Sequence, residues 1–227
     1  MISKWERAFT PGKLDLHLAE QAGGRSEPSG TETTAQSPRT LQDIAMRIRD
    51  LPLEQMDEAQ RLVAEEAISG KRGRMPGPLR VWIHSPELGR HAQRLGEFLR
   101  YSTTLGPRLS ELAILVTARV WTAHYEWFAH KREALKAGLE PEIVDAIAKR
   151  QAPSFPDAKA KAVYDYATAL QQTHQVPEDV HEAAVAAIGE RGVVELVGLL
   201  GYYTLVAMTL NAFEFPLPEG EAIELEP

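Results

Sequence analysis

Apolar residues recur along most of this chain at the three- and four-residue spacing of an amphipathic helix. The segments 41–50 and 53–69 follow this spacing. The segment 85–102 does so after a helix-start signal, because Ser85 suits a cap position and Pro86 suits the first helical turn. No segment alternates apolar and polar residues between turns, as a half-buried strand would. The pattern therefore predicts an all-α protein.

The remainder of the chain continues the helical pattern. The predicted helical regions run over 108–137, 141–150, 158–173, 177–189 and 190–213. The first of them ends at Gly138, where a glycine suits the left-handed end of a helix. Asp157 is expected to cap the helix that follows it.

The N-terminal part of the chain differs from the rest in composition. Residues 23–38 contain almost nothing that a core could bury, and we interpret them as a disordered linker. We therefore expect an N-terminal extension at 1–40, partly disordered, followed by one domain at 41–222. A length of 227 residues suits one domain with an appended tail.

Composition and charge exclude several classes of function. The net charge of −7 argues against a nucleic-acid partner, which requires a basic face to neutralise phosphates. The chain has no cysteine, which excludes disulfides, iron–sulfur clusters and thiol catalysis. The first residues, 1–13, lack the apolar core of a secretory signal, so a cytoplasmic protein is expected.

One apolar segment approaches the length of a membrane span. Residues 196–213 contain no charged side chain, but glycine, tyrosine, threonine and asparagine interrupt the apolar run. No basic cluster flanks the segment closely to fix an orientation in a membrane. We therefore expect no membrane partner and interpret the segment as a buried helix at the centre of a homo-oligomer.

Candidate chemistry lies in the stretch WTAHYEWFAH, residues 121–130. Glu126 and His130 are four residues apart, so on a helix they share one face and can exchange a proton. A carboxylate beside an imidazole provides an acid and a base. We expect the neighbouring aromatic residues to line the substrate site, and these are Trp121, Tyr125 and Trp127.

Further candidates lie earlier in the same helical region. Arg119, two turns before the glutamate of the pair, and Arg108 are the candidates to hold a substrate carboxylate. Glu111, nineteen residues before the histidine, is a candidate relay for protons. On a straight helix it lies about 100° away, so it joins the pair only if the helix bends or a new one begins near Thr122.

Two other interpretations of the same residues are open. Glu126, His130 and Glu133 could form an ordinary ion-pair cluster on a helix surface, with no chemistry. His124 could join Glu126 and His130 around a metal, but the two-residue step from His124 places it on another helix face. No familiar metal motif supports that site, so neither a metal nor another cofactor is expected.

These residues carry a resemblance to a known family. The sequence ELAILVTARVWTAHYEWFAHKREALKAGL, residues 111–139, resembles the core of the carboxymuconolactone decarboxylase family, which includes alkylhydroperoxidase D-like proteins. The segments 77–101 and 195–220 resemble the same family in its branch with a Tyr-Glu-Trp sequence, and the similarity covers about 56–220. The resemblance implies an all-α, alkylhydroperoxidase D-like helical bundle that assembles into trimers, hexamers or other homo-oligomers.

Peroxidase members of this family use a glutamate, a Cys-x-x-Cys pair and a histidine. Their glutamate and histidine correspond to Glu111 and His130, whereas their cysteines correspond to Ala123 and Glu126. Without a thiolate, no sulfur can attack a peroxide. The resemblance therefore implies no thiol peroxidase activity for this chain.

Decarboxylase-type members resemble this chain through a glutamate four residues before the histidine, as in Glu126 and His130. This implies acid–base chemistry on a small carboxylated lactone or oxo acid, by decarboxylation, isomerisation or hydrolysis. The alternative is a non-catalytic, oligomeric relative that binds a small ligand without transforming it.

Overall fold

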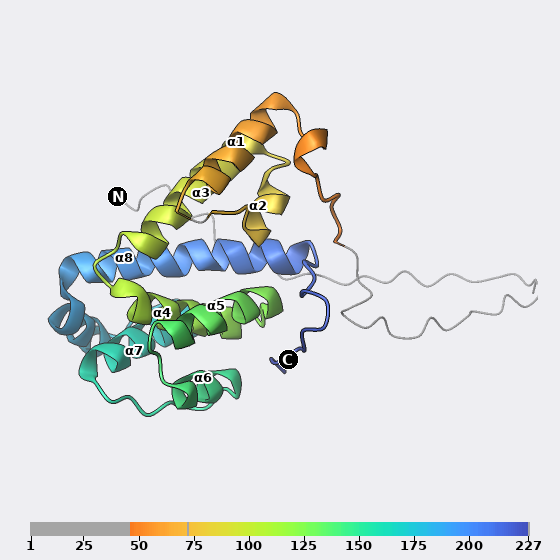
Figure 1. Cartoon of the computed structure of the whole chain (residues 1–227). Helices are drawn as coiled ribbons and strands as arrows, with labels where there is room; N and C mark the ends of the chain where they lie inside the picture. The colour runs from red at the N-terminus through yellow and green to blue at the C-terminus, as the bar shows by residue number, and fades with distance from the viewer. Residues whose placement is uncertain (1–45, 72, 227) are drawn as a thin grey trace, which may run out of the picture. The chain divides into compact units, whose positions relative to one another are not determined.

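The computed structural model describes residues 46–71 and 73–226, and every regular element in this part of the chain is a helix (Figure 1). The all-α prediction is thereby confirmed. The elements are η1 (Leu53–Gln55), α1 (Glu58–Ser69), α2 (Gly77–Trp82), α3 (Pro86–Tyr101), α4 (Gly106–Val120), α5 (His124–Lys136), α6 (Pro141–Ala148), α7 (Ala158–Thr173) and α8 (Glu178–Ala212). The predicted linker at 23–38 and the extension at 1–40 lie outside the described residues.

Helix ends mostly follow the local signals. Asp157 caps α7 by accepting a hydrogen bond from the backbone N–H of Ala160 at 2.8 Å, and Gly138 adopts φ 86° after α5. The predicted helix at 41–50 is wrong for residues 46–50, which are not helical. Two causes act there: the Arg47 N–H donates to the carbonyl of Phe213 at 3.0 Å, and a proline at position 52 disfavours helix before it.

Helix α8 is the central element of the described chain. It lies between α1–α3 on one side and α4–α7 on the other (Figure 1), and its buried face carries Leu196, Leu199, Tyr203 and Val206. The predicted boundary between two helices is confirmed at Gly189, whose φ of 75° and ψ of 164° interrupt the helix. Among the described helices, α8 alone is long and apolar enough to cross a membrane by length and composition, but 61% of that window is buried within the protein.

The predicted helical region over 108–137 consists of two helices, which is the alternative that the sequence left open near Thr122. Helix α4 ends at Val120, and α5 begins at His124. Thr122 adopts a left-handed φ of 45°. The Ala123 N–H then donates back to the carbonyl of Ala118 at 2.8 Å, a bond typical of helix ends. A new helix therefore begins near Thr122, the condition under which Glu111 can approach His130.

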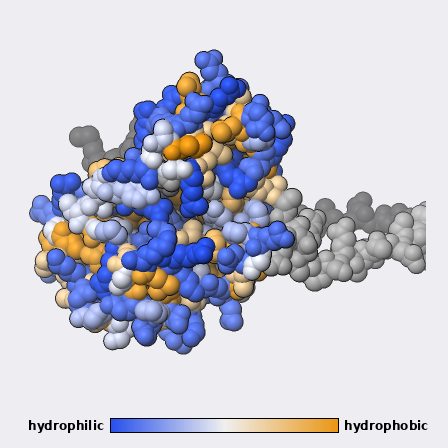
Figure 2. Space-filling view, in the orientation of Figure 1, coloured by the Kyte–Doolittle hydropathy of each residue, from blue (hydrophilic) through white to orange (hydrophobic). Residues whose placement is uncertain are grey.

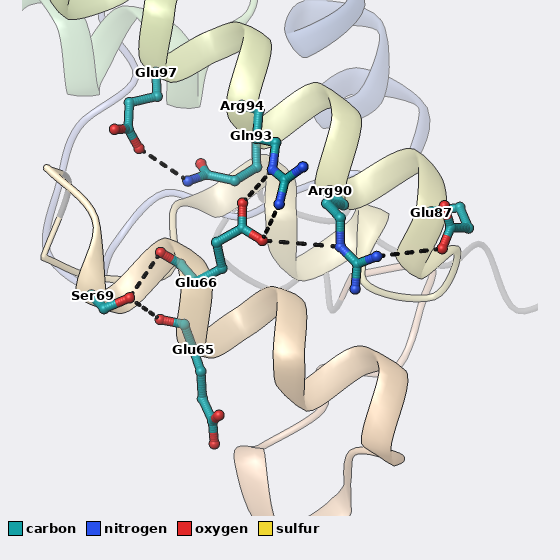
Figure 3. Close-up of polar contacts among 8 residues, drawn as sticks. All are labelled: Glu65, Glu66, Ser69, Glu87, Arg90, Gln93, Arg94 and Glu97. Carbon is teal, nitrogen blue, oxygen red and sulfur yellow. Dashed lines mark hydrogen bonds and ion pairs between the residues drawn. The ribbon is translucent and has the colours of Figure 1, made fainter.

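Ion pairs join α1 to α3, the helix that supplies two side chains to the site described below. Glu66 of α1 accepts hydrogen bonds from Arg94 at 2.6 and 3.0 Å and also contacts Arg90, both on α3 (Figure 3). The Arg94 guanidinium holds the pKa of Glu66 below its ordinary value. On the same helix, the Gln93 amide contacts Glu97 at 3.4 Å (Figure 3).

Apolar side chains remain exposed on α8 and on α3. On α8 they are three or eight residues apart, which places them on one face of the helix as a stripe, and Val194, at its start, is 72% exposed. The other large side chains of the α8 stripe are Val197, Leu205 and Met208. On α3, Leu88 and Leu95 are exposed, although the sequence pattern predicts them on the buried face with Ala92 and Leu99. Apolar patches among charged residues are also visible over α1–α3 in Figure 2.

The close approach of α2 and α3 yields a testable prediction. A Cβ added to Gly89 would lie 3.2 Å from the carbonyl oxygen of Trp82, so backbone must shift, and Gly89→Ala should destabilise the protein by roughly 1–3 kcal/mol. A Cβ added to Gly201 on α8 meets nothing within 4 Å. Within one chain, Gly201→Ala should therefore be neutral or gain up to about 1 kcal/mol from helix propensity. Urea unfolding of both variants measures the difference, and equal effects would contradict this packing.

Candidate active site

Four helices enclose a cavity of about 580 Å³, including the space at its mouth. Aromatic side chains from α2, α5 and α8 supply much of its wall, and these are Trp82, Tyr125, Tyr202 and Tyr203. Polar side chains from α3 and α5 also line it, and these are Gln93, Arg100, Glu126 and His130. A concave, largely apolar site with a few converging polar groups is typical of a small-molecule site.

The carboxyl group of Glu126 is the most buried of these polar groups. The residue is only 1% exposed, and neither carboxyl oxygen has a hydrogen-bond partner among the described residues. Burial raises its pKa well above the ordinary value, and the negative charge of Glu111 raises it further. Both effects disfavour the ionised form, so the fold favours a neutral carboxylic acid that can donate a proton.

His130 is held by a carboxylate behind it. Its Nδ1 lies 2.6 Å from Oε2 of Glu111 on α4, and its ring packs edge-on against Tyr203 at 4.8 Å between centroids. An ionised carboxylate only accepts hydrogen bonds, so Nδ1 then carries the proton and donates it. In the neutral form of the ring, Nε2 is then the nitrogen that can accept a proton.

Arg100 brings a positive charge to the cavity. Its Nε lies 3.6 Å from Oε1 of Glu111, and its Nη2 lies 3.6 Å from Oε2 of Glu133. These separations are longer than hydrogen bonds, so the guanidinium keeps N–H donors for a ligand. An arginine with donors available in a partly apolar cavity can bind a carboxylate through two parallel hydrogen bonds.

The residues predicted from the sequence to be catalytic lie close together, but their contacts differ from the prediction. Glu126 and His130 line the same cavity, as their spacing on one helix face suggests. The hydrogen-bond partner of the His130 ring is Glu111, however, and no hydrogen bond joins His130 to Glu126. Because Glu126 is almost fully buried, the interpretation of Glu126, His130 and Glu133 as an ion-pair cluster on a helix surface is wrong.

The two arginines proposed to bind substrate lie elsewhere. Arg108 forms ion pairs with Glu140 and Asp157, at 2.8 and 2.9 Å. Arg119 donates to the hydroxyl of Thr122, at 3.1 Å. Neither arginine lines the cavity, because the turn after α4 separates the face of Arg119 from that of α5.

Of the three aromatic residues predicted to bind substrate, only Tyr125 lines the cavity. Its ring packs against Phe215 at 4.5 Å between centroids. Trp127 is buried on the other side of α5, and its indole N–H donates to Glu224 at 3.3 Å. Trp121 ends α4 and contributes to a separate hollow beside α7 and α8. The cavity wall on that side is formed instead by Tyr202 and Tyr203.

Sequence reasoning missed Arg100, Gln93 and Tyr203. Arg100 and Gln93 lie on α3, before the quoted stretch, and Tyr203 lies on α8, far after it. Their helices were recognised, but a helical pattern does not show which side chain of one helix meets another helix. One signal was present in the sequence: Gln93 and Glu97 are four residues apart, so on a helix their side chains lie on the same face and can contact each other.

The described residues contain no group of three or more His, Asp or Glu side chains placed to hold a metal ion. His124, the third member of the metal set considered from the sequence, lines a different hollow with Asn211 and Phe215. Burial and the positive charge of Arg119 lower the pKa of His124.

Comparisons with known proteins agree with this architecture. The model of the carboxymuconolactone decarboxylase family matches residues 86–169, which run from α3 into α7. Among curated proteins, none matches the chain. The resemblance seen in the sequence is thereby confirmed for this segment.

Two solved structures share the fold. An uncharacterised peroxidase-related protein from Silicibacter sp. TM1040 aligns with a TM-score of 0.62 and 17% identity, over 82% of this chain and 96% of that one. A protein of unknown function from Agrobacterium tumefaciens, with a suggested AhpD role in antioxidant defence, aligns with a TM-score of 0.55 and 18% identity. That alignment covers 61% of this chain and 95% of the other. At these identities the likeness establishes the alkylhydroperoxidase D-like fold alone.

The burial of Glu126 yields a prediction about pH. Its pKa is raised in the folded chain, so its contribution to stability is fully present below the pKa of an unfolded glutamate, about 4.3. That contribution is lost as the pH rises through the raised folded pKa. Glu126→Gln removes the charge and keeps the shape, so its Tm should exceed that of the wild type increasingly as the pH rises above about 5.

Calorimetry between about pH 5 and about pH 9 measures this difference. Glu142→Gln, at an exposed position of α6, is the matched control and should follow the wild type. Parallel curves of Tm against pH for Glu126→Gln and the wild type would show that the pKa of Glu126 is not raised in the folded protein.

Proposed function

We propose that this chain, which carries a carboxymuconolactone decarboxylase family domain at residues 86–169, is an acid–base enzyme acting on a small carboxylated lactone or oxo acid. One observation carries the proposal: a buried carboxyl group without a partner, Glu126, shares a cavity with a histidine held by Glu111. Pairs of titratable groups whose surroundings favour opposite protonation states are typical of acid–base sites.

The roles follow from the charges. Arg100 binds the substrate carboxylate that does not react. Nε2 of His130 accepts a proton from a substrate carbon or from a water molecule, while Glu111 stabilises the imidazolium that forms. The neutral carboxyl of Glu126 donates a proton where negative charge develops. The aromatic walls exclude water and so strengthen each of these interactions.

The same pair serves each of the three reactions considered. In decarboxylation, the carbon–carbon bond breaks, carbon dioxide leaves, and Glu126 protonates the resulting enolate. In isomerisation, His130 removes a proton from one carbon and Glu126 delivers one to another. In hydrolysis, His130 activates water and Glu126 protonates the departing oxygen. Which of them operates depends on where the substrate carbonyl lies relative to the two side chains.

Thiol peroxidase activity is incompatible with this site. A cysteine thiolate is the group that would attack a peroxide, and the chain has no cysteine. By the resemblance, Glu126 occupies the position of one of the two cysteines of peroxidase members. A carboxyl group there can move a proton but cannot form a disulfide.

The alternative function is a non-catalytic protein that binds a small ligand. The aromatic walls of the cavity favour it, since Trp82, Tyr125, Tyr202 and Tyr203 can enclose an apolar carboxylate without reacting with it. The two functions differ in outcome. Incubation with a panel of carboxylated lactones and 3-oxo acids, followed by mass spectrometry, should reveal a product for the enzyme and unchanged ligand for the binding protein.

Substitutions in the pair test the mechanism on whichever substrate turns over. General acid–base catalysis contributes about 10²–10⁴ in rate, so Glu126→Gln and His130→Ala should each lower kcat by about that factor. Arg100→Gln should chiefly raise KM, because it removes a binding contact. Glu142→Gln is the matched control and should keep the wild-type kcat. Full activity in both pair variants would assign the pair a structural role.

We also propose that the protein is a cytoplasmic homo-oligomer, a trimer or hexamer by the family resemblance. Support comes from the exposed apolar stripe of α8, where Val194 is 72% and Met208 50% exposed. Contiguous apolar surface of this kind is typical of an interface between subunits. The other proposed partner is the small-molecule substrate.

Light scattering after size exclusion tests the assembly. The wild type should elute as a multimer at micromolar concentration, and the double variant Val194→Asp, Met208→Asp should shift toward the monomer, because burying unpaired carboxylates is unfavourable. Leu62→Asp on α1, 53% exposed but away from the stripe, is the matched control and should leave the mass unchanged. A monomeric wild type would contradict the proposal.

A further inference from the structure

Arg119 is the most buried lysine or arginine in the described chain, with 5% of its surface exposed. Its Nη1 donates to the hydroxyl of Thr122 at 3.1 Å, and its Nη2 donates to the carbonyl oxygen of Glu226 at 2.7 Å. Its Nε has no hydrogen-bond partner among the described residues. By contrast, the less buried Arg100 and Arg108 each contact two carboxylates.

A buried guanidinium without a paired carboxylate is unfavourable, because a buried charge requires a counter-charge to offset its lost hydration. Among the described carboxylates, none forms an ion pair with Arg119. Burial and the positive charge of Arg150 lower the pKa of Arg119, while the charge of Glu226 acts in the opposite direction. Among the described residues, Arg119 therefore has two hydrogen-bond acceptors but no carboxylate in an ion pair with it.

Arg119 and Arg150 line a shared cavity of about 420 Å³ between α4, the end of α6, and α7. None of its lining residues is acidic, in a chain whose net charge is −7. The remaining lining residues are Val116, Val120, Ile147, Gln151, Tyr164, Thr168 and Gln172. The hydroxyl of Thr168 is buried and, like the Arg119 Nε, has no partner among the described residues.

Acidic groups do occur nearby, on another side of the two arginines. Asp145, Glu224 and Glu226 line an adjoining hollow together with Lys149. Glu224 is already paired with Lys131 at 2.5 Å and accepts from Trp127. The cavity between α4 and α7 therefore faces guanidinium, hydroxyl and amide groups without a carboxylate of its own.

We propose that this cavity is a second ligand site that binds a small organic carboxylate, with the carboxylate against Arg119 and Arg150. The hydroxyl of Thr168 donates a further hydrogen bond to it, and Val116 and Ile147 contact the apolar body of the ligand. Two guanidinium groups and a hydroxyl match the acceptors of a carboxylate. The site shares no lining residue with the cavity of Glu126, so it does not depend on the proposed function.

Calorimetric titration of the full chain with benzoate tests the site. Arg150→Gln should weaken benzoate binding at least about tenfold, because a charge-assisted hydrogen bond is lost. Thr168→Val should also weaken it, whereas an unused buried hydroxyl could be replaced by a methyl group without loss of binding. Arg132→Gln, an exposed arginine on α5, is the matched control and should bind benzoate as the wild type does.

Two further variants locate the bound probe. Arg100→Gln alters the cavity of Glu126 and should leave benzoate binding at the second site intact. Loss of binding in Arg100→Gln together with full binding in Arg150→Gln would place benzoate in the first cavity and overturn the proposal. Absence of any heat or Tm change at millimolar benzoate would also overturn it, as would binding of inorganic phosphate in preference to benzoate.

Discussion

The contact between Glu111 and His130 requires the chain to leave the helical path between α4 and α5. On one straight helix the two residues would lie about 100° apart, and no hydrogen bond could join them. The left-handed Thr122 and the bond from Ala123 to Ala118 end α4 and start α5 in a new direction. The 2.6 Å contact that results fixes the imidazole, and the buried α8 supports its ring through Tyr203.

Two carboxyl groups with different surroundings, those of Glu126 and Glu111, lie near that fixed imidazole. Glu126 lies in an apolar pocket without a hydrogen-bond partner among the described residues, so its neutral form is favoured. Glu111, by contrast, contacts both His130 and Arg100. Two carboxyl groups in one site can thus serve as proton donor and as orienting anion, with a cation available for substrate. Ion pairs between α1 and α3 help to position that cation (Figure 3).

Local features of this chain were predictable, and tertiary ones were not. The cap at Asp157, the turn at Gly138 and the break at Gly189 follow from the residue at each position. The end of α4 was left open, because its turn uses Thr122, whose side chain gives no signal for a left-handed conformation. Arg119 was misplaced for the same reason, since its face was assigned on a helix that does not continue past Thr122. Arg100 reaches the site from α3, and no sequence spacing connects α3 with α5.

The central claim is that Glu126 is a neutral acid beside the Glu111–His130 pair, and its titration tests that claim most directly. Carbon-13 NMR of the glutamate carboxyl carbons across a pH series follows each group, and Glu126→Gln assigns the signal by its disappearance. A midpoint well above the ordinary glutamate value of about 4.3 is expected, because burial and the charge of Glu111 raise the pKa of Glu126. A midpoint at or below the ordinary value would contradict it.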